Sequence, residues 1–90
     1  GQLLNPLVVI EILSKSTAGV DLGEKVAEYT SIDSLQDYLI FSQTEIWVKH
    51  YFRIDENTWN FVIYENIEES ILLECLALQM PLKEIYERIE

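Results

Sequence analysis

The stretch from Leu7 to Leu13, "LVVIEIL", limits the possible folds of this chain more than any other. Six of its seven residues are aliphatic, and Val and Ile dominate. Such a run predicts a β-strand that is buried on both faces. Glu11 interrupts it, and a buried carboxylate is costly unless it is protonated, paired or bound to a metal. A fold and a function for this chain must therefore account for Glu11.

Downstream, the hydrophobic period changes from that of a helix to that of strands. In "DLGEKVAEYTSI", Leu22, Val26 and Tyr29 share one helical face, and Asp21 is a suitable N-cap. The residues of "EIWVKHYFRI" then alternate between two faces, and "DEN" joins this segment to the next apolar one as a hairpin. Strands are expected at Tyr38–Ser42, Ile46–Arg53 and Trp59–Tyr64, with a short one in "SILLECL" and a last helix that opens at Pro81.

This order of elements predicts an α+β fold, with a mixed β-sheet flanked by short helices. The 90 residues suffice for a single domain, residues 1–90. One short helix and one terminal helix barely cover both faces of the first strand. We therefore expect the chain to form part of a larger domain.

Charge and cysteine content narrow the functional classes. Sixteen acidic residues against six Lys and Arg give a net charge of −10, whereas nucleic-acid binders usually present a basic face. The lone Cys75 excludes an internal disulfide and fits a reducing compartment, so we expect a cytoplasmic protein. Glu11 and Lys15 interrupt the longest apolar run, so no membrane span is expected.

Glu11 has two interpretations, and the residues alone leave both open. A carboxylate on a central strand can be a hard oxygen ligand for Mg²⁺. It can equally reach solvent or pair with Lys15 or Lys25. Lys25 lies in a helix, where a lysine is usually a surface residue, and becomes a functional candidate only if it points at Glu11.

Two further groups have a structural and a functional interpretation. His50 alternates with apolar residues, which favours a satisfied, half-buried histidine in a sheet over a general base. Trp47, Tyr51 and Trp59 could form a platform for stacked bases. Packing of aromatic rings across the strands of a hairpin is the more ordinary explanation for them.

The order and spacing of several motifs resemble the Uma-type family of bacterial restriction endonucleases. The matching segments are "NPLVVIEILSKST", "DLGEKVAEYTSI", "SLQDYLIFSQ" and the late "MPLKEIYE". In that family the corresponding motifs are a VEVLS-like strand, a D-x-GEK helix with a following Tyr, and an LPLxEIYE-like tail. The resemblance covers nearly the whole chain.

The resemblance implies a restriction-endonuclease-like fold of the PD-(D/E)xK superfamily and Mg²⁺-dependent hydrolysis of DNA phosphodiesters. It implies that Glu11 is a metal ligand and that Lys25, in "GEK", is the catalytic lysine, because the position two after Glu11 is Leu13. Lys15 matches the family pattern less well.

One departure from the family concerns the second metal ligand. The family's metal-binding Asp lies upstream, whereas this chain has ten residues before Glu11 and none is Asp. The chain thus resembles the C-terminal half of a family domain, with an incomplete Mg²⁺ site, and we expect it not to cleave DNA by itself. The alternative is a non-catalytic module for protein binding or self-assembly, and an acidic mimic of nucleic acid is a weaker third. Because the first strand is apolar on both sides, we also expect a homo-oligomer.

Overall fold

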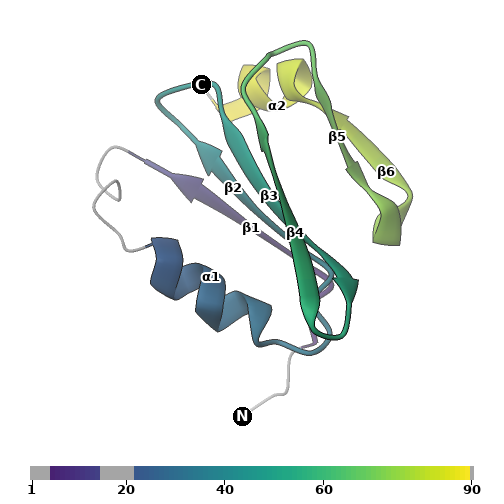
Figure 1. Ribbon diagram of the computed structural model, residues 1–90. Coiled ribbons are helices and arrows are strands. Elements are labelled where there is room, and N and C mark those ends of the chain that lie inside the picture. Colours follow the sequence, from purple (N-terminus) through teal and green to yellow (C-terminus); the bar gives the residue numbers. More distant parts are fainter. Residues whose placement is uncertain (1–4, 15–21, 90) are drawn as a thin grey trace.

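The computed structural model describes residues 5–14 and 22–89. Its elements are, in order, β1 (Val8–Leu13), α1 (Leu22–Thr30), β2 (Asp37–Ser42), β3 (Val48–Asp55), β4 (Thr58–Tyr64), β5 (Ser70–Leu73), a 3-10 helix (Glu74–Leu76), β6 (Leu78–Pro81) and α2 (Leu82–Ile89) (Figure 1).

Four strands form one mixed sheet in the order β1-β2-β3-β4. β1 pairs parallel with β2, and α1 makes the connection between them, as parallel strands require. β2, β3 and β4 are antiparallel neighbours joined by short connections. β5 and β6 form a separate two-stranded antiparallel ladder.

The two faces of the sheet carry separate cores. On one face α1 packs over β1 and β2, around the buried Leu35, Tyr38 and Ile40. On the other face β5, β6 and α2 cover a second core, which contains Leu39, Phe41, Val48, Ile71, Leu73, Leu82 and Tyr86. The sheet thus separates two environments, and the alternation of residues along each strand decides which side chain enters which.

The α2 helix is attached to the sheet by a hydrogen bond as well as by apolar packing. The hydroxyl of Tyr86 donates to the backbone oxygen of Trp47 at 2.7 Å. Leu82, at the start of α2, is fully buried in the same core. None of the helices in the described ranges is long and apolar enough to cross a membrane.

The predicted α+β class, the mixed sheet, the first helix and the four main strands are confirmed. Two details differ. Ile46 lies outside β3 and is exposed, because the turn after β2 takes up residues 43–47. The "SILLECL" segment is β5 followed by a 3-10 helix, and the added strand β6 ends at Pro81, directly before α2. Asp21, predicted as the N-cap, lies outside the described residues.

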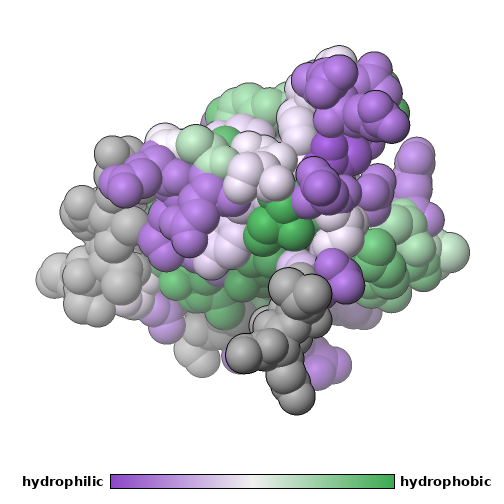
Figure 2. All heavy atoms as spheres, turned by 90° about the horizontal axis from the view of Figure 1, so that it is seen from below, coloured by the Kyte–Doolittle hydropathy of each residue, from purple (hydrophilic) through white to green (hydrophobic). Residues whose placement is uncertain are grey.

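The expectation that the first strand is buried on both faces is wrong. Val9 and Leu13 pack under α1, but Ile10 and Ile12 on the opposite face are 48% and 49% exposed. The reason is positional, because β1 lies at the edge of the sheet and the β5–β6 layer covers only its start, at Val8. Seen from below, apolar side chains reach the surface between polar ones (Figure 2).

Candidate functional site

Glu11 and Lys25 meet on the face of the sheet that α1 covers. Glu11 lies in β1 opposite Ile40 of β2, and Lys25 lies in the first half of α1. The Nζ of Lys25 donates to Oε1 of Glu11 at 3.1 Å. The Glu11 side chain is 17% exposed and that of Lys25 35%, so both remain in contact with solvent. The hydrogen bond to Glu11, and then its charge, raise the pKa of Lys25 above its usual value.

Tyr29 is a second helical partner of Glu11. It follows Lys25 by one helical turn, so both side chains leave α1 on the same side. A hydrogen bond from the Tyr29 hydroxyl to Glu11 is the main reason why the pKa of Tyr29 is raised. Its ring also packs against that of Tyr38 of β2, with centroids 4.8 Å apart. The carboxylate of Glu11 is thus held by two residues of one helix.

The structure therefore brings together the two residues that the sequence singled out as catalytic candidates. Lys25 points at Glu11, and this contact is what a functional role for the lysine was expected to require. Lys15, the weaker candidate, lies outside the described residues. The catalytic roles of Glu11 and Lys25 stay predictions, because an ion pair alone can also be structural.

The fit to Mg²⁺ is partial. The carboxylate of Glu11 is a hard oxygen ligand of the kind that Mg²⁺ prefers. Within residues 5–14 and 22–89, however, no three His, Cys, Asp or Glu side chains come together in a way that could hold a metal ion. Glu11 thus offers one carboxylate, and the charged group that pairs with it is a cation, Lys25, at 3.1 Å.

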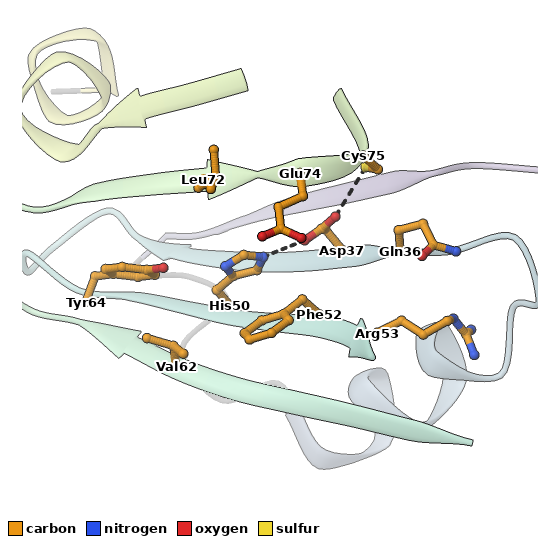
Figure 3. Close-up of a pocket in the computed structure, with 10 residues that line it drawn as sticks. All are labelled: Gln36, Asp37, His50, Phe52, Arg53, Val62, Tyr64, Leu72, Glu74 and Cys75. Carbon is orange, nitrogen blue, oxygen red and sulfur yellow. Dashed lines mark hydrogen bonds and ion pairs between the residues drawn. The ribbon is translucent and has the colours of Figure 1, made fainter. Parts of the chain in front are cut away.

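A second polar cluster, which the sequence did not reveal, lies on the opposite face of the sheet. Asp37 of β2 and His50 of β3 line a pocket of about 260 Å³ together with Glu74 and Cys75 (Figure 3). Oδ1 of Asp37 lies 2.7 Å from Nε2 of His50, and its Oδ2 accepts a hydrogen bond from the Cys75 thiol at 3.3 Å. Both oxygens of this buried carboxylate are therefore engaged.

His50 is more deeply buried than predicted. It is 3% exposed, and its Nδ1 has no hydrogen-bond partner among the described residues. A carboxylate can only accept a hydrogen bond, so in the ionised form of Asp37 the contact has Nε2 of His50 as its donor. Burial, followed by the hydrogen bond to Asp37, raises the pKa of Cys75, which keeps it a weakly nucleophilic thiol.

A sequence signal for the Asp37–His50 contact exists but is weak. Asp37 lies on the same face of β2 as Leu39 and Phe41, which face the second core. His50 lies directly opposite Leu39 in the β2–β3 register. The contact follows only when the register is known, since the two residues are diagonal neighbours across the strands.

Of the three aromatic residues, Tyr51 packs across the strands of the hairpin, with its ring centroid 4.7 Å from that of Phe61, as the more ordinary explanation holds. Trp47, Tyr51 and Trp59 are partly buried against the core beneath α1. Arg53 lies over the Trp59 ring, 4.6 Å from its centroid. Its guanidinium also donates to the backbone oxygens of Leu35 and Ile32, so Arg53 links β3 to the segment between α1 and β2.

Comparison with known proteins gives the family. The Uma2 family, described as "Putative restriction endonuclease", matches residues 2–83. The chain therefore belongs to the Uma2 family.

Two relatives come from Synechocystis sp., and both are uncharacterised proteins. The protein slr1290 is 32% identical over 81 residues, which cover 90% of this chain and 42% of that protein. The protein sll1609 is 38% identical over 55 residues, which cover 61% of this chain and 31% of that protein. The matched segments thus cover less than half the length of either relative.

A solved structure has the same fold. It is the crystal structure of "a putative nuclease belonging to DUF820" from Anabaena variabilis, with a TM-score of 0.76 and 16% identity. The match covers 98% of this chain and 48% of that one. At this identity the similarity shows a shared fold, and the fold agrees with the family assignment.

Proposed function

We propose that the chain contributes Glu11 and Lys25 to the active site of a Mg²⁺-dependent DNA endonuclease of the PD-(D/E)xK type. The observation that carries this proposal is the 3.1 Å contact between Nζ of Lys25 and Oε1 of Glu11. These two residues are 14 positions apart in sequence, one in a helix and the other in a strand. The family description and the name of the Anabaena protein support nuclease chemistry, and DNA as the partner follows from them.

The chemistry suits the two side chains. Mg²⁺, when bound, would supply the positive charge that stabilises a developing phosphorane. Glu11 offers it one hard oxygen ligand. The ammonium of Lys25, whose charge Glu11 stabilises, can donate to a phosphate oxygen or orient a water molecule. Tyr29, one helical turn after Lys25, also interacts with the Glu11 carboxylate.

The metal site of this proposal needs at least one further oxygen ligand beside Glu11. We propose that this ligand is supplied by residues outside 5–14 and 22–89 or by another chain. The net charge of −10 opposes binding to DNA phosphates, so a bound cation is needed near Glu11 for DNA to approach. We therefore propose that the 90-residue chain does not cleave DNA by itself.

The metal part of the proposal can be tested with Mn²⁺, a paramagnetic substitute for Mg²⁺. We expect Mn²⁺ to broaden the amide NMR signals of residues near Glu11 and Lys25 first, and Glu11→Gln to abolish this effect. Asp55→Asn is the matched control, since Asp55 is an exposed carboxylate far along the β3–β4 hairpin. Identical broadening in wild type and Glu11→Gln would contradict the proposal.

A second candidate function is a non-catalytic module for self-assembly or protein binding. It is favoured by the exposure of Ile10 and Ile12 in the open strand β1 and of Leu7 directly before it, each close to half exposed. Solvent contact with such apolar surface forfeits roughly 25 cal/mol per Å². Homo-oligomerisation is compatible with both candidates, as is the cytoplasmic location that we propose from the lone cysteine.

A further inference from the structure

The outer edge of β4 is the most unusual surface feature of the sheet. β4 pairs with β3 on one side, and no strand of residues 5–14 or 22–89 pairs with it on the other (Figure 1). Its seven residues, "TWNFVIY", include no charged residue, no Pro and no Gly. Natural sheets usually protect an open edge with Lys, Pro or a strong bulge, because bare backbone donors and acceptors recruit another strand.

A row of aromatic rings crosses the sheet and ends at this edge. Tyr38, Tyr51 and Phe61 are directly paired in neighbouring strands, and Tyr29 of α1 begins the row. The ring centroids of Tyr38 and Tyr51 are 6.0 Å apart, and those of Tyr51 and Phe61 are 4.7 Å apart. Phe61 is 43% exposed, as is Ile63 two residues further on. Among the described residues, the row therefore stops at Phe61, whose ring has an aromatic partner on one side, Tyr51.

We infer that β4 pairs antiparallel with β4 of a second copy of this chain, about a two-fold axis that passes between the two Phe61 residues. This arrangement joins two four-stranded sheets into one continuous sheet. Phe61 then lies opposite Phe61 of the second copy, and Trp59 lies opposite its Ile63. Aromatic pairs and pairs of an aromatic with a β-branched residue are the favourable cross-strand neighbours in antiparallel sheets.

Charge favours β4 over β1 as the self-complementary edge. Two antiparallel copies of β1 would bring two Glu11 carboxylates close together in a chain that already carries −10. β4 brings no charged residue opposite another, so its pairing is not opposed within the strand. Acidic residues flank it at both ends, with Glu56 before it and Glu65 after it. The antiparallel arrangement places these ends near each other, so salt strengthens the dimer by screening them.

The size of the contact sets its strength. A strand of seven residues is about 24 Å long, at ~3.4 Å per residue. Such a strip buries less than the ~800 Å² per partner of a standard interface, so the dimer is concentration-dependent. This inference is independent of the proposed nuclease site, which lies around Glu11 at the other edge of the sheet.

The register can be tested by disulfide trapping in a Cys75→Ser background. Directly opposed residues in an antiparallel pair have Cα atoms about 4.5–5.5 Å apart, within reach of a disulfide. We expect Phe61→Cys to form covalent dimers on mild oxidation. Ile63→Cys is the matched control on the same strand and face, because its two copies lie about 14 Å apart in this register. Ile10→Cys reports on the β1 edge.

Selective trapping of Phe61→Cys supports the inference. Trapping of Ile10→Cys alone, or equal trapping of Phe61→Cys and Ile63→Cys, overturns it. Sedimentation velocity between about 10 and 300 µM checks the unmodified chain, for which we expect a dimer that strengthens with salt. Phe61→Lys should weaken this dimer at least tenfold, whereas Leu72→Lys, at an exposed position of β5, should leave it unchanged. A monomer over the whole concentration range overturns the inference, whatever the outcome of metal or nuclease assays.

Discussion

Nε2 of His50 lies 2.7 Å from Oδ1 of Asp37, and both side chains are almost fully buried. His50→Ala should lower the free energy of unfolding by about 3–5 kcal/mol, because it leaves the Asp37 carboxylate buried without its main partner. Asp37→Asn should cost less, since the amide oxygen can still accept from Nε2–H. Urea denaturation measures both variants. The exposed Asp33→Asn is the control, with an expected change within about 0.5 kcal/mol. A loss below about 1 kcal/mol in His50→Ala would show that the pair contributes little.

The hydroxyl of Tyr86 connects α2 to the loop before β3, through the backbone oxygen of Trp47. Tyr86→Phe removes this hydrogen bond and the one that the hydroxyl accepts from the backbone N–H of Trp47, and it should lower the free energy of unfolding by about 1–2 kcal/mol. Tyr64→Phe is a matched control, because no hydrogen bond of the Tyr64 hydroxyl is found within the described ranges. Thermal or urea unfolding compares the two variants. Equal effects would mean that the hydroxyl of Tyr86 is not what holds α2.

All five tyrosines have pKa values raised above the ordinary 10.0, and burial is the largest cause for all of them except Tyr29. A group whose pKa is raised on folding stabilises the fold below its unfolded pKa, and this stability is lost as pH rises through the folded pKa. We therefore expect stability to fall steeply above about pH 10. Phenolate absorbance at 295 nm should rise together with the loss of far-UV circular dichroism. Complete phenolate formation with a midpoint near 10 in a still folded chain would contradict this.

With Mg²⁺ and supercoiled plasmid, the 90-residue chain should show no nicking above that of Glu11→Gln. The reason is that the described residues bring no three metal-ligating side chains together. Agarose gels over a range of Mg²⁺ and salt concentrations provide the measurement. Nicking that disappears in Glu11→Gln would show that another acidic residue completes the site in this chain.

Periodicity carried most of the fold prediction. The alternation in "EIWVKHYFRI" predicted β3 and its two faces, since Val48 and His50 enter one core while Trp47 and Tyr51 pack against the other. Periodicity could not give the place of a strand within the sheet. The first strand was therefore predicted to have two buried faces, whereas β1, at the edge of the sheet, has one. β6 has four residues, of which the last is Pro81, too few for a period-2 pattern to be recognised.

The candidate site, like the fold, could be predicted only in part from the sequence. Spacing alone left a pair of Glu11 with either Lys15 or Lys25 open, because the contact depends on how α1 crosses the sheet, and the family resemblance favoured Lys25. The Asp37–His50 pair was missed because it depends on the β2–β3 register, which a sequence without a tight two-residue turn leaves undetermined. Asp37 also stands at the start of its strand, where an acidic residue usually reaches solvent.

The parallel pairing of β1 with β2 has a consequence for the order in which the molecule folds. β2, β3 and β4 are close in sequence and can pair as consecutive hairpins. Val8 and Asp37 are 29 positions apart in sequence (37 − 8 = 29), so they pair only after the long connection between them has closed. β1 should therefore dock last and, with a strand neighbour on one side alone among the described residues, detach first. Its amide hydrogens should exchange faster than those of β2. The contact between Glu11 and Lys25 then exists only in the fully assembled sheet, so any chemistry that depends on it is lost at the first step of unfolding, while the β2–β4 meander is still intact.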